Sequence, residues 1–210
     1  MAGGYELRDP ARGGQLTVDM GGRTAGAATV FRDADNTWGT GTLADRASVA
    51  VDAHYGAAVT WDYFKSTHGR LGIANDGRGA VSRVHFGRNF NNAFWSDACF
   101  CMTYGDGDGL TFNPLVALDV AAHEMTHGIT NRTAGLIYSG ESGGLNEATS
   151  DIFGAAVEFY AKNTKDKGDY VVGEKVFKAS GHLIRSMVQP SVDGSSADCW
   201  FPGVGKLDVH

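Results

Sequence analysis

One short stretch constrains this chain more than any other. Residues 119–130 read DVAAHEMTHGIT, an apolar, helix-compatible run that also contains two histidines and two acids. Because an α-helix turns once every ~3.6 residues, Asp119, His123 and His127 lie along one face of the helix, while Glu124 projects to its side. Two imidazoles at this spacing can bind a single metal ion.

Zinc is the metal that this pattern favours. Neutral imidazole nitrogen is a common zinc ligand, and a catalytic zinc site has three protein ligands and one open position for water. The motif H-E-x-x-H combines two such ligands with a glutamate that acts as general base. We therefore expect His123 and His127 to bind zinc and Glu124 to be the base. The alternative is a chance match in a purely structural β protein, which would bind no zinc.

A second predicted helix supplies the third ligand. Residues 143–161 read GGLNEATSDIFGAAVEFYA, in which Glu147, Asp151 and Glu158 lie near one face of an otherwise apolar helix. These acids either face solvent or meet cations and donors, because burying them unpaired is costly. A short connection allows the helix to return antiparallel to the first one. Glu147 then completes the zinc site, and Asp151 or Asn146 accepts the outer N–H of a ligand histidine.

Motifs along nearly the whole chain, in order, resemble the thermolysin-like neutral zinc metalloproteases. Those around the two helices are HEMTH, AGLIYSGESGGLNEATSDIFG and VEFY. The others are DADN at 33–36, VDAHYGAAVTWDYF at 51–64, NNAFW at 91–95, YGDGDG at 104–109, LIRSM at 183–187 and DVH at 208–210. The resemblance implies an α+β, two-lobe metalloprotease fold.

The pattern of the chain changes near residue 115. Residues 1–114 contain short runs with β-branched residues between Gly and Asp turns, which predict a β-rich lobe. One long helix is predicted within it, from about 45 to 69, ending at a glycine. Residues 115–210 form the helical, zinc-binding lobe, which the resemblance implies is incomplete because family members continue with more helices beyond DVH. The zinc helix is expected to form the floor of a cleft between the lobes.

The resemblance also implies catalytic roles in peptide hydrolysis. Zinc activates a water molecule, Glu124 accepts its proton, and Tyr138 and His210 stabilise the oxyanion that forms. Asp208 orients His210. Without the resemblance, Tyr138 would be read as an ordinary core tyrosine and His210 would carry no significance.

Substrate contacts are implied by two further motifs. The Asn92 side chain and the Ala93 carbonyl hold a peptide as an added edge strand, and Arg185 reaches both a substrate carbonyl and Asp151. Without the resemblance, Arg185 would be read as part of a surface ion pair. The expected substrate is a peptide or protein, cleaved before bulky apolar residues, and the enzyme is expected to be a monomer.

Calcium is the second expected metal, because carboxylates converge beside the zinc helix. The resemblance implies one main calcium site formed by four acids: Asp119, Glu158, Asp169 and Glu174. The loop KNTKDKGDYVVGE is longer than in some relatives, so the choice between Asp166 and Asp169 stays open. A weaker site is implied at DADN, through Asp33 and Asp35.

Charge and composition limit the partners. The net charge is −6 and the pI is about 5.6, and no basic stripe occurs, which argues against nucleic acid as a partner. No apolar run reaches the length of a membrane span. The resemblance implies a secreted bacterial enzyme, although the N-terminus lacks the apolar segment of a signal peptide. The cysteines, Cys99, Cys101 and Cys199, leave at least one unpaired, and the pairing stays open.

Two functions from different classes follow. The first is a zinc-dependent endopeptidase with Glu124 as base. The second is a catalytically impaired fragment of such an enzyme that binds metal without cleaving peptides. Zinc-dependent proteolysis abolished by Glu124→Gln would support the first, and zinc binding without proteolysis would support the second.

Overall fold

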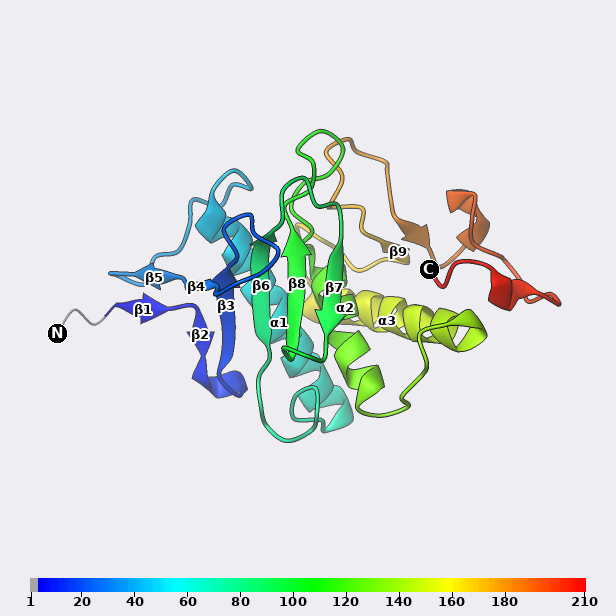
Figure 1. Ribbon diagram of the computed structural model, residues 1–210, viewed down its shortest axis with the longest axis horizontal. Helices are drawn as coiled ribbons and strands as arrows, with labels where there is room; N and C mark the ends of the chain where they lie inside the picture. The colour runs from blue at the N-terminus through cyan, green and yellow to red at the C-terminus, as the bar shows by residue number, and fades with distance from the viewer. Residues whose placement is uncertain (1–3) are drawn as a thin grey trace.

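The computed structural model describes residues 4–210, which form a mixed β-sheet packed against long helices (Figure 1). The helices are α1 (Arg46–His68), α2 (Leu118–Asn131) and α3 (Gly140–Ala161). The main sheet has the spatial order β2 (Arg8–Asp9), β3 (Gln15–Asp19), β6 (Val81–Phe86), β8 (Cys101–Gly105) and β7 (Ala93–Ser96), and β4 (Thr29–Val30) also pairs with β3.

Strand direction changes at the end of the sheet that carries β7. Strands β3, β6 and β8 run parallel, whereas β7 runs antiparallel to β8, with Ala93 opposite Tyr104. Because β7 is the last strand in this order, one of its edges has no neighbouring strand within the described sheet. The α+β class expected from the sequence is confirmed.

Smaller elements surround the sheet. Two separate two-stranded ladders join β1 (Tyr5–Glu6) to β5 (Arg32–Asp33), and β9 (Val171–Val172) to β10 (Arg185–Ser186). Short 3-10 turns are η1 (Pro10–Arg12), η2 (Pro190–Asp193) and η3 (Val204–Lys206). In the part of the chain that the structure describes, no helix combines the length and the apolar character needed to cross a membrane.

Helix α1 has clear local signals at both ends. The Asp45 side chain accepts a hydrogen bond from the Ser48 amide at 2.9 Å and so satisfies a free N–H of the first turn. At the other end, Gly69 has φ 66°, the left-handed conformation that glycine adopts without steric strain. The long helix predicted from about 45 to 69 is confirmed.

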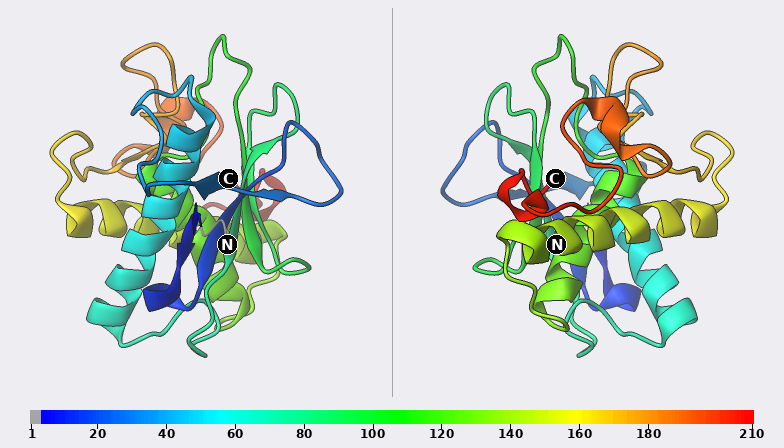
Figure 2. Two further views of the ribbon diagram at one scale, coloured as in Figure 1. Left: turned by 90° about the vertical axis from the view of Figure 1, so that its left-hand side faces the viewer. Right: turned by 90° about the vertical axis from the view of Figure 1, so that its right-hand side faces the viewer.

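Helix α2 lies between α1 and α3. A glycine in α1 and another in α3 allow each of these helices to pack closely against α2. A Cβ added at Gly56 of α1 would lie 2.5 Å from the Ala121 Cβ, and one added at Gly154 of α3 would lie 3.0 Å from the Asp119 carbonyl oxygen. Figure 2 shows α1 and α2 on the same face of the sheet. This packing buries α2 almost entirely and turns its histidine face toward α3.

Candidate metal centre

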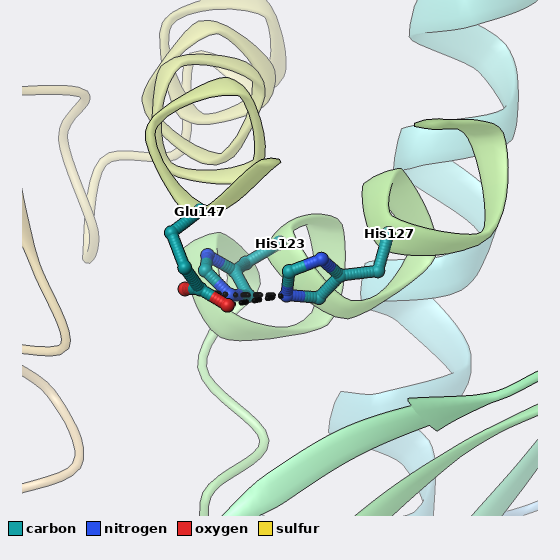
Figure 3. Close-up of side chains that lie close together, drawn as sticks. All are labelled: His123, His127 and Glu147. Atoms are coloured by element: carbon teal, nitrogen blue, oxygen red, sulfur yellow. Dashed lines mark hydrogen bonds and ion pairs between the residues drawn. The ribbon is translucent and has the colours of Figure 1, made fainter. Parts of the chain in front are cut away.

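The two histidines of α2 meet a glutamate of α3 (Figure 3). The Nε2 atoms of His123 and His127 are 2.9 Å apart, which matches one turn between them. Glu147 places Oε2 3.3 Å from His123 Nε2 and Oε1 3.2 Å from His127 Nε2. These three residues, called the imidazole cluster below, therefore converge as the sequence predicts.

Outer hydrogen bonds orient both imidazoles. His123 Nδ1 lies 2.8 Å from Asp151 Oδ1, and His127 Nδ1 lies 2.7 Å from Asn146 Oδ1. Because a carboxylate or amide oxygen can only accept, each Nδ1 donates the proton of its outer hydrogen bond, and each ring turns its Nε2 atom toward the centre. Asp151 and Asn146 thus occupy the positions expected for them.

Ser150 is a further partner that the sequence reasoning missed. Its Oγ lies 3.2 Å from His127 Nδ1. Ser150 follows Asn146 by four residues, so both side chains lie on the same face of α3. That spacing was visible in the sequence, but serine is too common in helices for spacing alone to identify it.

The electrostatics of the imidazole cluster favour positive charge. Burial lowers the pKa of His123, but the hydrogen bond to Asp151 and the nearby carboxylate of Glu147 outweigh it and raise this pKa to about 10. Burial raises the pKa of Glu147, but the two histidines outweigh it and hold this pKa well below its ordinary value. Glu147 Oε2 is also buried and accepts no hydrogen bond from the described residues. Two imidazoles and one carboxylate with a free oxygen fit a zinc ion.

Glu124 lies beside the imidazole cluster without belonging to it. Its side chain is buried, and it lines the same cleft as His123, His127 and Glu147. Burial raises the pKa of Glu124, and the neighbouring histidines oppose this shift. A carboxylate with a raised pKa holds a transferred proton more readily than an ordinary one, as a general base requires.

The cleft above α2 has a volume of about 590 Å³. Strand β7 and the preceding residues Asn91 and Asn92 line this cleft. So does a group of apolar side chains, called the apolar wall below: Phe112, Leu115, Val120, Val172 and Ile184. The sequence reasoning did not identify this wall, because its members come from separate segments and only tertiary packing brings them together.

Tyr138 and His210 meet at the mouth of the cleft. The Tyr138 hydroxyl donates to Glu147 Oε1 and lies 3.1 Å from His210 Nε2. Asp208 Oδ1 is 2.6 Å from His210 Nδ1, which fixes the ring. Burial, reinforced by the Glu147 carboxylate, raises the pKa of Tyr138, so its hydroxyl keeps its proton.

Arg185 faces the opposite side of the cluster. Its Nε and Nη2 atoms lie 2.6 and 2.8 Å from the two oxygens of Asp151, which also bonds His123. The Arg185 side chain is only 17% exposed, so this is no surface ion pair. Asp151 therefore links Arg185 to the imidazole cluster.

Asn92 and Ala93 lie at the start of β7. The Asn92 carbonyl accepts from the Gly105 amide at 3.0 Å, and its side-chain oxygen accepts from the Ala93 amide at 2.9 Å. Both residues line the cleft.

A second group of acids lies near the end of α3. Ligand atoms of Glu158, Asp166 and Glu174, called the carboxylate cluster below, all lie within 4.8 Å of one another. Of the two acids between which the sequence left the choice open, Asp166 has a carboxylate oxygen within this distance, and Asp169 lies near enough to help raise the pKa values of Glu158 and Glu174. Asp166, in the longer loop, reaches the other two acids, whereas Asp169 Oδ1 accepts from the Val171 amide at 2.8 Å.

Asp119 adjoins the carboxylate cluster. Its oxygens accept from the Gly173 and Val120 amides, the latter at 2.7 Å. Burial and the neighbouring acids raise the pKa of Glu158 to about 9 and that of Glu174 to about 7, and burial raises that of Asp119 to about 6. Both carboxylate oxygens of Glu158 are buried and have no hydrogen-bond partner among the described residues.

The acids of DADN form a local turn. Asp33 Oδ1 accepts from the amides of Asp35 and Thr37 at 2.9 and 3.1 Å, and Asp35 Oδ1 accepts from Thr37. Within residues 4–210, no other His, Cys, Asp or Glu joins Asp33 and Asp35 in a group with metal-ligand spacing.

The structure resolves the cysteine pairing that the sequence left open. Cys99 and Cys101 form a disulfide with a Cα–Cα distance of 5.2 Å, and Cys199 is an exposed free thiol.

Two family profiles and several known proteins match this chain. The family profile described as thermolysin metallopeptidase, catalytic domain, matches residues 1–131, and that described as thermolysin metallopeptidase, alpha-helical domain, matches residues 134–210. A transglutaminase-activating metalloprotease of Streptomyces mobaraensis is 56% identical over 207 residues, which are 98% of this chain and 27% of the relative.

More distant relatives agree. Bacillolysin of Bacillus caldolyticus is 44% identical over 91% of this chain and 34% of its own length. Among solved structures, the precursor of protealysin, a metalloproteinase from Serratia proteamaculans, aligns with a TM-score of 0.70 at 33% identity, covering 84% of this chain and 53% of that one. The chain thus spans about a third or less of the curated relatives' length. It belongs to the thermolysin metallopeptidase family.

Proposed function

We propose that this chain forms the metal-binding core of a zinc-dependent endopeptidase. The observation that carries the proposal is the convergence of two imidazole nitrogens and one carboxylate, from α2 and α3, at the floor of an open cleft. A zinc ion held by His123, His127 and Glu147 would supply a Lewis acid that lowers the pKa of a water molecule to about 7.

The remaining residues of the cleft have the chemistry that hydrolysis needs. Glu124 accepts the proton of the attacking water and passes it to the leaving amine. Tyr138 and His210 donate hydrogen bonds to the oxyanion, and Asp208 keeps His210 oriented. The contact between Tyr138 and His210 at 3.1 Å supports a shared role for them.

Substrate binding is proposed along β7 and the apolar wall. A peptide would add to the free edge of β7 through main-chain hydrogen bonds near Asn92 and Ala93, and Arg185 would donate to a substrate carbonyl. The wall that contains Val120, Val172 and Ile184 suits a bulky apolar side chain after the scissile bond. The lobes 1–114 and 115–210 would then flank the bound peptide.

Calcium is proposed at the carboxylate cluster. Glu158 and Glu174 have raised pKa values, and both oxygens of Glu158 are buried without a hydrogen-bond partner among the described residues. Together with Asp166 they fit a hard dication, which would offset the repulsion among these acids. Asp119 and Asp169 adjoin this site, and a weaker second site at Asp33 and Asp35 rests on the resemblance alone. A secreted, monomeric bacterial enzyme is also proposed from the family relationship.

Three proteins test the proposed function: the unchanged chain, Glu124→Gln and the control Glu141→Gln, which changes an exposed glutamate of α3. Each is measured for zinc content and for cleavage of casein. We expect one zinc per chain in all three, and a kcat about 10²- to 10⁴-fold lower in Glu124→Gln alone.

One observation favours a catalytically impaired metal-binding fragment instead. The His210 side chain is 53% exposed and that of its partner Asp208 is 77% exposed, so little packing holds them in place. One zinc per chain without casein cleavage in the unchanged protein would favour this alternative over the endopeptidase.

A further inference from the structure

The turn between β7 and β8 contains the disulfide, and nothing in the proposed catalysis uses it. Cys99 and Cys101 flank a single residue, so their bond closes a very small ring around Phe100. Cys101 is the first residue of β8 and is buried, whereas Cys99 is exposed to solvent. The ring therefore joins an accessible sulfur to the interior of the sheet.

The ring encloses a residue in an unfavourable backbone conformation. Phe100 has φ 50°, in the left-handed region that a side chain with a Cβ rarely adopts. The Phe100 amide donates a hydrogen bond to the Asp97 carbonyl within the turn, at 3.3 Å. The Phe100 carbonyl accepts one from the Val81 amide, also at 3.3 Å. A covalent link between the flanking residues opposes relaxation of this conformation toward φ below zero.

This conformation directs the Phe100 ring into a cluster beneath the cleft. The ring packs edge-on against Trp95 of β7 with their centroids 5.3 Å apart. The guanidinium groups of Arg78 and Arg132 lie 4.8 and 5.8 Å from the Phe100 centroid, within the range of cation–π attraction. Phe100 thus supports Trp95, which lines the cleft.

The turn between β7 and β8 also contacts the C-terminal end of α2, the helix that carries the two histidines (Figure 1). Asp97 accepts from Asn131 Nδ2 at 2.6 Å and pairs with Arg132 at 3.0 Å. Trp95 also packs directly on α2, because a Cβ added at Gly128 would lie 2.9 Å from its ring. The turn, β7 and α2 therefore form one connected unit.

We propose that the Cys99–Cys101 disulfide is a redox-sensitive positioning device that holds β7 in register for peptide binding. When the bond is intact, Phe100 supports Trp95 and the edge of β7 is rigid. When it is reduced, Phe100 can leave the left-handed region, and the support of β7 from below is lost. This inference rests on the proposed function, since β7 is the strand to which a substrate peptide would add.

The redox step needs an external reductant, and a phosphine supplies it. The phosphine attacks one sulfur, the S–S bond breaks, and water converts the phosphonium to a phosphine oxide. Water also provides the protons of the two thiols, so the disulfide gains two electrons and the phosphine loses two. The exposure of Cys99 permits this attack, and a phosphine is preferred to a dithiol because dithiols bind zinc.

The test uses the Cys199→Ser protein, in which no other thiol can exchange with the disulfide. Cleavage of a short peptide and hydrogen exchange along the whole chain, including segment 91–104, are measured before and after treatment with a phosphine. On reduction we expect KM to rise about five- to tenfold with kcat within twofold, unchanged zinc content, and faster exchange confined to β7 and the turn.

A matched variant separates the disulfide from other effects of the reductant. Cys99→Ser with Cys101→Ala keeps the buried position apolar, and should show the raised KM without phosphine and no response to it. Reoxidation of the Cys199→Ser protein with oxidised glutathione, which accepts the two electrons, should restore the original KM.

Other outcomes would overturn the inference. Titration of two additional thiols before reduction would show that the disulfide is absent. Unchanged KM and unchanged exchange after reduction would show that it positions nothing, and faster exchange throughout the chain with an equal loss of kcat would show a general stabilising role. Faster exchange confined to β7 and the turn, in a protein that cleaves no peptide, would support the positioning role of the disulfide and refute the proposed function.

Discussion

Helix α3 contributes to two acid-containing groups, the imidazole cluster at Glu147 near its start and the carboxylate cluster at Glu158 near its end. In the imidazole cluster, the carboxylate of Glu147 faces the two imidazoles, and the outer hydrogen bonds that these rings donate to Asp151 and Asn146 hold them in place. In the carboxylate cluster, like charges meet: Lys175 pairs with Asp166 at 3.3 Å and with Glu174 at 3.5 Å, but both buried oxygens of Glu158 have no partner among the described residues.

The two clusters therefore differ in what a bound metal ion would do for the protein. The imidazole cluster is ordered by protein groups, so a metal there would serve chemistry more than folding. The carboxylate cluster is self-repelling when ionised, so a metal there would serve stability. The following predictions test this division, beginning with the largest effect.

Selective metal removal should separate the two clusters most clearly. A zinc chelator such as phenanthroline should abolish casein cleavage while lowering the Tm only slightly. A calcium-selective chelator should lower the Tm by about 5–10 °C, as expected for loss of a ligand present well above its Kd. Cleavage assays and thermal unfolding with each chelator check this, and a large Tm loss with the zinc chelator alone would contradict the division.

Asp151→Asn should weaken the imidazole cluster through its outer hydrogen bond. The substitution removes the charge that His123 Nδ1 and Arg185 share. We expect zinc affinity to fall about 10- to 100-fold, measured by competition with a fluorescent chelator. Glu141→Gln serves as the control, and equal zinc affinity in both variants would show that the Asp151 charge has no such role.

Glu158→Gln should remove the effect of calcium while leaving zinc bound. The amide is a poorer calcium ligand, but it also ends the repulsion among the buried acids. We expect the calcium-dependent rise in Tm to disappear and the calcium-free Tm at neutral pH to rise by about 2–4 °C. A calcium response as large as that of the unchanged protein would argue against the carboxylate cluster as the site.

The pH dependence of stability without calcium follows from the raised pKa values. The pKa of Glu158 is about 9 in the folded chain, against 4.5 for an ordinary glutamate. A carboxyl whose folded pKa is raised favours the folded state below its ordinary pKa and loses this contribution as pH rises through the folded value. Stability should therefore decline between about pH 5 and pH 9 in a calcium chelator.

Calcium should reverse this trend, because it binds the ionised carboxylates. The gap in Tm between calcium-loaded and chelated protein should widen steadily as pH rises, and the Glu158→Gln protein should show a much smaller change. Thermal unfolding at several pH values measures the gap, and a gap independent of pH would contradict the assignment.

Some of the site followed from local spacing alone. The i, i+4 placement of His123 and His127 predicts a shared ion, because helix geometry fixes their relative position whatever surrounds them. Helix α1 was likewise predictable from Asp45 and Gly69, since capping depends on neighbouring residues. The division into lobes at residues 114 and 115 stays a prediction.

Other features depended on segments distant in sequence. The choice of Asp166 over Asp169 was decided by how the longer loop folds back on α3, which spacing does not reveal. The apolar wall joins residues from before α2, within α2 and after α3, so no sequence window contains it.

The sequence by itself determined which side chains could serve as ligands and base, and the two helices that carry them, because helical periodicity is a local property. Tertiary structure decided that Glu147 meets the two histidines, that Asp166 joins Glu158 and Glu174, and that Cys99 pairs with Cys101 rather than Cys199. The first two outcomes depend on the close packing of the chain around α3, which brings together residues that are distant in sequence. The third depends on the conformation of the turn that follows β7.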